Sequence, residues 1–291
     1  MTGKFVDTLY YSYPRKYHRQ TENIYFLETD YGKIRSLDTR GNMPVIINVP
    51  DGPNVIEHQL PLIEKLSKTF RVICFEYPGL GYSYPSGKFN YSFDEGSKLL
   101  FQIMHILEIP VASLLFSCSN GFYALNAARL KPDGFNHIFL SQTPSVKSMI
   151  SWTKKSIPDL LKVPVIGQLS NVLMDKKLAN VWYHYALPRE SADRETFRAT
   201  ARQSLNNGGC FCLSSLVQCL IKESENKLEV DFNKVTLVWG GRDFTHRKTQ
   251  KETLQEHVSS CEIIEFEDSG HFPELEKPHD YVRLVRERVN S

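Results

Sequence analysis

The sequence predicts an α/β fold in which a mostly parallel sheet is flanked by helices and interrupted by one inserted helical segment. Short apolar runs such as Val45–Val49 are typical of strands buried on both faces of a parallel sheet. Segments with the helical spacing of apolar residues separate these runs, so helices are expected to connect the strands. From 143 to 229 this alternation stops. We therefore predict a core of residues 1–142 and 230–291 with an inserted helical segment at 143–229.

Composition limits the classes of function. The chain has 291 residues, of which 41% are hydrophobic, so it can bury a large core. Its net charge is only +2, from 35 basic and 33 acidic residues, which makes nucleic acid an unexpected partner and favours small molecules. The first 20 residues lack an apolar stretch, and no run of about 18 apolar residues occurs. We expect a cytoplasmic protein without a membrane partner; a homodimer stays open.

The six cysteines predict neither disulfides nor a metal site. Their spacing is not that of a short-range disulfide framework, so we expect reduced thiols. Cys210, Cys212 and Cys219 lie close together, but paired Cys-x-x-Cys motifs and nearby histidines are missing. We therefore expect no metal and no cofactor.

The first half of the chain has recognisable strands, turns and helix starts. Residues 24–28 and 33–38 are predicted to form an antiparallel edge hairpin, and Arg71–Phe75 a buried strand. Between these strands, 56–66 has helical spacing of apolar residues. Ser92 and Glu95 form a capping box that predicts a helix start, whereas the glycines and proline of 76–83 predict a shaped loop without chemistry.

The stretch 114–125 organises the rest of the chain. An apolar run meets a cluster of small residues and is followed at once by helix-forming residues, which predicts a tight strand-to-helix turn. Ser119 is predicted at its apex with a strained backbone, because Ser117 and Gly121 supply the small neighbours two positions away. The N–H of Asn120 would then point to the place where an oxyanion forms. Cys118 is out of register with Gly121, which disfavours it as a nucleophile.

The second half predicts polar residues at the ends of two further strands. Residues 235–239 form a buried strand pattern, and Asp243 follows shortly after it. The strand pattern 135–140 is followed only by Ser141 and Gln142, so no carboxylate stands at its end. The last strand pattern, 261–266, leads to the segment Gly-His-Phe-Pro-Glu-Leu-Glu-Lys-Pro, which contains His271, and then to a terminal helix pattern.

These motifs occur in the order found in the α/β-hydrolase family, which the chain resembles over nearly its whole length. The resemblance implies an eight-stranded sheet with a helical cap at 143–229, and a catalytic triad of Ser119, Asp243 and His271. It also implies that the loop after Val45–Val49 supplies the second oxyanion donor. Gly52 takes that position, because Pro53 has no N–H.

The resemblance implies a serine hydrolase that cleaves an ester, thioester or related acyl bond of a small, largely apolar substrate. Carbon–carbon bond hydrolysis, lactone opening and aminopeptidase activity stay open, because the fold and the triad do not separate them. A ligand-binding protein with a retained but slow triad is a further alternative. Trp152, Trp182 and His184 are the candidates for the substrate pocket within the cap.

Two residues of the oxyanion loop depart from the family pattern, and Pro50 stands where the family usually has a histidine. Asp51 occupies the place where the family has a glycine, next to the expected oxyanion hole. Its carboxylate either opposes the negative charge that develops there and selects cationic substrates, or only caps a turn.

Overall fold

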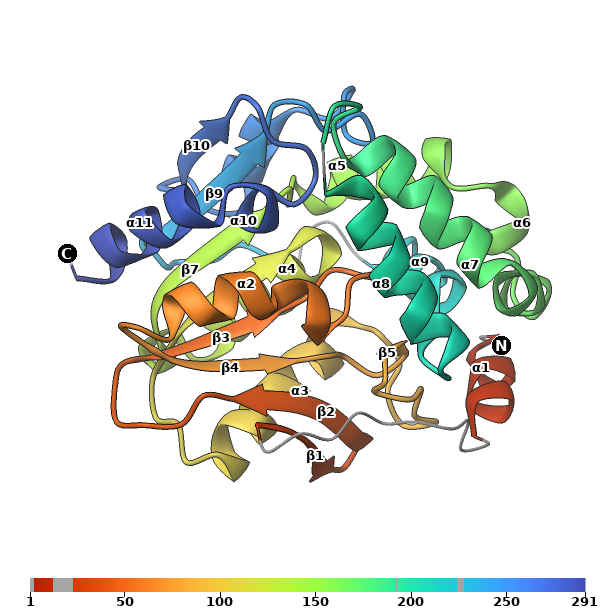
Figure 1. The fold of residues 1–291 in the computed structure, drawn as a ribbon, viewed down its shortest axis with the longest axis horizontal. Coiled ribbons are helices and arrows are strands. Elements are labelled where there is room, and N and C mark those ends of the chain that lie inside the picture. Colours follow the sequence, from red (N-terminus) through yellow and green to blue (C-terminus); the bar gives the residue numbers. More distant parts are fainter. Residues whose placement is uncertain (1–2, 13–22, 192, 224–227, 291) are drawn as a thin grey trace.

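The computed structural model of the protein describes residues 3–12, 23–191, 193–223 and 228–290 (Figure 1). Its centre is the predicted eight-stranded sheet, in the order β1-β2-β4-β3-β6-β7-β9-β10. Only β2 runs antiparallel to its neighbours, β1 and β4; all other pairs are parallel, which confirms the prediction. The strands are β1 (Ile24–Thr29), β2 (Gly32–Asp38), β3 (Val45–Val49), β4 (Arg71–Phe75), β6 (Ala112–Ser117), β7 (Phe135–Ser141), β9 (Val235–Gly240) and β10 (Glu262–Phe266).

Helices cover both faces of the sheet, which explains the nearly continuous apolar runs. Successive strand residues point to opposite faces, so Ile46 packs with α2 (Ile56–Leu66) and α11 (Pro278–Val289), whereas Ile47 packs with α3 (Phe93–Ile106) and α4 (Gly121–Leu130) (Figure 1). The same alternation places Leu114 and Leu115 in two different cores. The predicted cap at Ser92 is present, since its side chain accepts a hydrogen bond from the N–H of Glu95.

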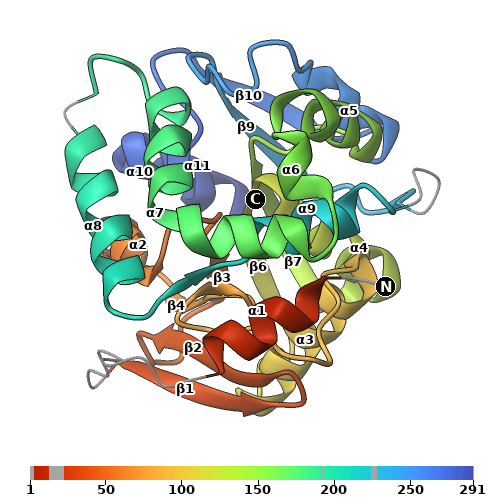
Figure 2. The same cartoon turned by 90° about the vertical axis from the view of Figure 1, so that its right-hand side faces the viewer.

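Between β7 and β9 the chain forms mainly helices, as predicted (Figure 2). The elements are α5 (Val146–Ser156), α6 (Asp159–Lys162), α7 (Ile166–Ala186), α8 (Arg194–Asn206), β8 (Cys210–Phe211) and α9 (Leu213–Leu220). β8 pairs with the short strand β5 (Leu80–Gly81) of the core. The remaining elements are α10 (Pro273–Glu276) and the 3-10 turns Cys118–Asn120, Pro132–Gly134 and Lys251–Glu256.

The first helix packs against the helical segment that follows β7. α1 (Lys4–Tyr11) lies beside α7, and its buried Asp7 accepts a hydrogen bond of 2.6 Å from Ser215 of α9 (Figure 2). Its contacts therefore join α1 to the helical segment, although the two are far apart in sequence. The division of the chain into two domains stays a prediction.

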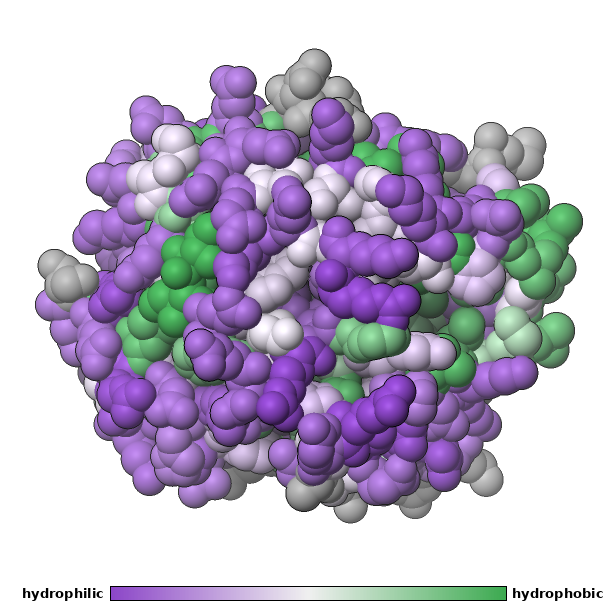
Figure 3. Space-filling model, turned by 90° about the horizontal axis from the view of Figure 1, so that it is seen from above, coloured by the Kyte–Doolittle hydropathy of each residue, from purple (hydrophilic) through white to green (hydrophobic). Residues whose placement is uncertain are grey.

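The surface is mostly hydrophilic when seen from above (Figure 3). Apolar side chains gather in a band on the left and at the right-hand end, where α6 and the start of α7 lie (Figure 3). Those exposed on α6, on α7 and between them include Leu160, Val163, Ile166, Leu169 and Leu173. None of the helices in the described part of the chain combines the length and apolar character needed to cross a membrane.

A buried ion-pair network holds the loop after β4. Arg35 has no exposed surface, and its guanidinium donates to Glu57 at 2.6 Å and to Glu76 at 3.0 Å. Glu76 also accepts the N–H groups of Ile56 and Tyr82. The loop without predicted chemistry is thus anchored by a buried carboxylate.

Arg35→Met is expected to lower the free energy of unfolding by about 3–5 kcal/mol, because it leaves the buried Glu76 carboxylate without its cation. Urea denaturation at neutral pH measures the change. The matched control on the same strand is Lys33→Met. Lys33 and its partner Glu28 are both exposed, so less than about 1 kcal/mol should be lost. Equal losses for the two variants would contradict a buried network at Arg35.

Candidate active site

The tight turn after β6 places its strain on Cys118, one residue earlier than predicted. Cys118 has a φ of 54°, whereas Ser119 follows within a 3-10 turn and α4 begins at Gly121. Left-handed angles are unusual for a residue other than glycine. The apex residue is therefore Cys118, and the predicted strain at Ser119 is wrong.

Gly121 has a different purpose from the one that the sequence suggested. A Cβ at this position would lie 2.5 Å from Oγ1 of Thr143, so glycine lets α4 approach the chain after β7. The Thr143 hydroxyl in turn donates to the carbonyl of Cys118 at 2.9 Å. Gly121 thus serves the packing of α4 against the chain after β7.

Asp243 and His271 meet as predicted, because they follow the adjacent parallel strands β9 and β10. Nδ1 of His271 lies 2.6 Å from Oδ2 of Asp243, and both side chains are buried. Asp243 also accepts hydrogen bonds from Thr245, at 2.8 Å from its N–H and 2.5 Å from its hydroxyl. Burial raises the pKa of Asp243, but His271 and these donors outweigh burial and lower it to about 2. The carboxylate is therefore ionised and orients the imidazole.

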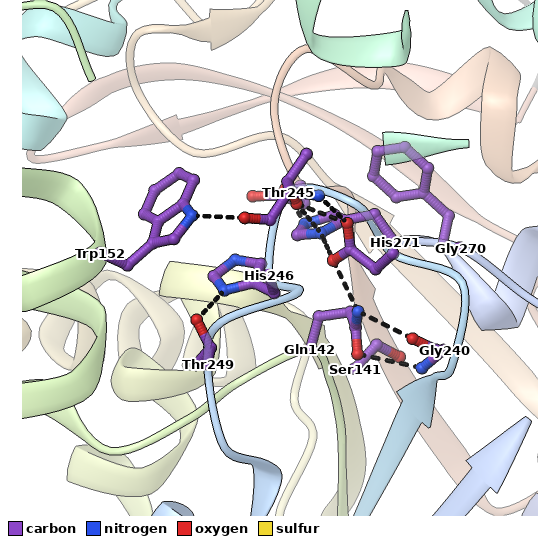
Figure 4. Close-up of polar contacts among 12 residues, drawn as sticks. Ser141, Gln142, Trp152, Gly240, Thr245, His246, Thr249, Gly270 and His271 are labelled. Carbon is purple, nitrogen blue, oxygen red and sulfur yellow. Dashed lines mark hydrogen bonds and ion pairs between the residues drawn. The ribbon is translucent and has the colours of Figure 1, made fainter. Parts of the chain in front are cut away.

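Gln142 is a member of this network that the sequence analysis did not identify (Figure 4). Its Nε2 donates to Oδ2 of Asp243 at 2.6 Å, and its Oε1 accepts the N–H of Gly240 at 3.0 Å. Gln142 follows β7, so three neighbouring strands supply the network. A polar residue at the end of a buried strand was its only signal.

The other nitrogen of His271 faces Asp51, whose side chain is 8% exposed. Oδ2 of Asp51 lies 3.3 Å from Nε2 of His271, so Asp51 points toward the imidazole. Burial lowers the pKa of His271, but Asp243 and Asp51 outweigh burial and hold it well above its usual range. The imidazole thus lies between two carboxylates and favours its charged form.

Cys118, rather than Ser119, contacts the imidazole. The Cys118 sulfur lies within 4.8 Å of a ring nitrogen of His271 and interacts with the ring. In the described part of the chain, no hydrogen bond joins the Ser119 hydroxyl to His271. Burial and the nearby Asp51 raise the pKa of the Cys118 thiol to about 11. The resting site therefore holds a protonated thiol beside an imidazole.

The loop at 50–53 contacts this turn. The side chain of Asn120 donates to the carbonyl of Pro50 at 3.1 Å and so ties the start of α4 to the loop. Gly52 is tightly enclosed, since a Cβ there would lie 2.8 Å from Leu80 and 2.9 Å from Phe211. The N–H of Ser119 faces the Cys118 sulfur.

His246, three residues after Asp243, is a further site residue that the sequence analysis missed (Figure 4). Its ring stacks on Trp152 at 4.6 Å and on His271 at 5.3 Å between ring centroids. Burial lowers the pKa of His246 to about 3, so this ring is neutral. It supports His271 from one side, and the only sequence signal was a histidine close to the acid.

Cys118, His246 and His271 form the one group of ligand-type side chains found among the described residues. The two imidazole planes differ by only 18° and stack, so their in-plane lone pairs run side by side and do not converge on one ion. The arrangement as it stands therefore does not fit a tetrahedral zinc ion.

A cavity of about 50 Å³ opens at Cys118 and Ser119 and is lined mainly by apolar side chains. Trp152 and Trp182 line it, as predicted for pocket residues, together with Asp51. His184 lines a different cavity of about 220 Å³. The reason is helical geometry, because two residues along α7 turn the side-chain direction by about 200°.

Comparisons with known proteins agree with the fold. The family model described as alpha/beta hydrolase fold matches residues 44–278. A search of curated proteins found no match.

Several solved structures share the fold at low sequence identity. A hydrolase from Pseudomonas aeruginosa has a TM-score of 0.70 and 15% identity, with 94% of this chain and 100% of that chain covered. An enol-lactonase from Burkholderia xenovorans has a TM-score of 0.71 and 16% identity, with 92% and 100% covered. An esterase from Exiguobacterium antarcticum has a TM-score of 0.67 and 15% identity, with 91% and 99% covered.

Proposed function

Since the chain belongs to the alpha/beta hydrolase fold family, we propose that it hydrolyses an ester or thioester of a small, largely apolar acyl group, and that Cys118 is the nucleophile. The observation that carries this proposal is the position of Cys118 at the strained apex of the turn, against an imidazole whose far nitrogen is held by Asp243. A thiol, an imidazole and an orienting carboxylate are the three parts of a nucleophilic triad.

The reaction follows from these positions. Neutral His271 accepts the thiol proton, and the Cys118 thiolate attacks the acyl carbonyl, whose oxygen becomes an oxyanion. The N–H groups of Gly52 and Ser119 are the donors that we assign to this oxyanion, so Gly52 stays as predicted and Ser119, the residue after the nucleophile, replaces Asn120. His271 then protonates the leaving group. Water deprotonated by His271 attacks the thioester of Cys118 and releases the acid.

Asp51 sets the protonation state from which the reaction starts. In its charged form, His271 carries a proton on Nε2, the nitrogen that faces Asp51. This proton must leave before the imidazole can act as a base. Turnover is therefore expected to rise with pH through neutrality.

Covalent labelling distinguishes Cys118 from Ser119 as the nucleophile. We expect a small acyl thioester, mixed with the protein and quenched in acid, to leave an acyl adduct on the peptide that contains Cys118, as seen by mass spectrometry. A fluorophosphonate probe provides the opposite test. Labelling of Ser119 by this probe, without an adduct on Cys118, would restore the serine hydrolase that the sequence predicts.

A ligand-binding protein with a slow triad is the second candidate, favoured by the Asp51 contact that keeps His271 charged. Steady-state kinetics separate the two functions. Release of several thiol equivalents per protein supports the enzyme, whereas a thermal shift with ligand but less than one turnover supports the binder. Carbon–carbon hydrolase, lactonase and aminopeptidase activities use the same fold, so substrate panels must include them.

A further inference from the structure

A much larger chamber adjoins the cavity at Cys118. Its volume is about 790 Å³, against about 50 Å³ for the inner cavity. Both are lined by Trp152 and Trp182, so these two indoles lie between the inner cavity and the chamber. Trp182 also packs edge-on against His271, at 5.0 Å between ring centroids. A substrate that presents its carbonyl to Cys118 would thus extend past the indoles into the chamber.

The charge of the chamber has one sign. Its charged lining residues are Lys155 of α5 and Arg247 and Lys248 of the loop after β9, and no carboxylate is among the described lining residues. All three cations are exposed, and none of them has an ion-pair partner within the described ranges. The guanidinium of Arg247 lies 3.8 Å above the ring of Phe244, which restricts its position. Three unpaired cations around one chamber attract an anion.

The chamber also offers hydrogen-bond donors. The indole N–H of Trp182 is buried and has no hydrogen-bond partner in the described structure, although its ring lines both cavities. Ser148, Ser151 and Thr249 add hydroxyl groups to the wall. A buried donor without a partner is costly unless a ligand or water accepts from it. Oxygen-rich groups satisfy both the donors and the cations.

We infer that the chamber binds the leaving group of the substrate, and that this group is anionic and carries a phosphate or carboxylate. The inference rests on the proposed function, since it assigns the other half of the substrate for the same site. The small apolar cavity then takes a short acyl group, and the chamber takes the larger, charged alcohol or thiol.

Four thioesters of the same butyryl group test the inference: butyryl-coenzyme A with phosphates, S-butyryl-3-mercaptopropionate with a carboxylate, the neutral S-butyryl-N-acetylcysteamine and the cationic butyrylthiocholine. We expect kcat/KM to be highest for the two anionic thioesters and lowest for the cationic one. A larger advantage for either anion identifies the phosphate or the carboxylate as the preferred group. High salt should remove the advantage, because ions screen exposed charges.

Charge reversal locates the effect. The triple variant Lys155→Glu, Arg247→Glu and Lys248→Glu is expected to raise KM for butyryl-coenzyme A at least about tenfold at low salt and to leave the neutral thioester nearly unchanged. Lys154→Glu is the matched control, since Lys154 is exposed on the same helix but does not line the chamber. Equal rates for all four thioesters, unaffected by salt or by the triple variant, would overturn the inference while leaving hydrolysis intact. Failure to cleave any of the four would instead count against the proposed function.

Discussion

Cys118→Ala is expected to lower kcat/KM for an acyl thioester at least about a thousandfold, because it removes the atom that forms the covalent intermediate. Ser119→Ala is the neighbouring control and should keep activity within about tenfold. Its hydroxyl makes no hydrogen bond with His271 among the described residues, and its backbone N–H survives the substitution. Steady-state kinetics with a small neutral thioester measure both variants, and thermal melting checks that both are folded.

The opposite ranking would assign the reaction to the serine. If Ser119→Ala loses activity and Cys118→Ala keeps it, the thiol only occupies the apex of the turn. Cys118→Ser adds a third comparison, because it restores a hydroxyl at the strained position. If Cys118→Ser keeps weak activity and Cys118→Ala has none, the position itself, and not only the sulfur, is suited to nucleophilic attack.

Asp51→Asn is expected to raise kcat/KM for neutral thioesters at pH 7 by roughly ten- to a hundredfold. Burial lowers the pKa of His271, whereas Asp243 and Asp51 raise it well above the usual range. Without the charge of Asp51 the pKa of His271 falls, so a larger fraction of the imidazole is neutral at pH 7. In addition, the Asp51 charge opposes the negative charge of the oxyanion. At about 5 Å and an effective dielectric near 20 this repulsion costs about 3 kcal/mol, which is roughly a hundredfold in rate. The acidic limb of the pH–rate profile should therefore move to lower pH.

The equivalent substitution on the other side of the imidazole, Asp243→Asn, should lower kcat/KM instead of raising it. Asp243→Asn removes the group that orients Nδ1, and we expect a loss of roughly a thousandfold or more. Asp51→Glu keeps the charge and should give no gain. A loss of activity in Asp51→Asn, with an unchanged pH profile, would show that the carboxylate takes part in the reaction instead of restraining it.

Much of the fold could be predicted because it depends on patterns along the chain. Apolar runs such as Val45–Val49 are required wherever helices cover both faces of a strand, and the structure has helices on both faces. Asp243 and His271 follow neighbouring parallel strands, so their meeting at one edge of the sheet follows from the topology.

Tertiary structure alone decided the direction of each side chain at the site. Cys118 and Ser119 are adjacent and both can act as nucleophiles, and the choice depends on which residue adopts the left-handed angle. The hydroxyl of Thr143 donates to the carbonyl of Cys118, although Thr143 lies 25 positions later in the chain. Asp51 faces His271 for the same kind of reason. Sequence patterns locate residues along the backbone, whereas contacts between distant segments orient their side chains.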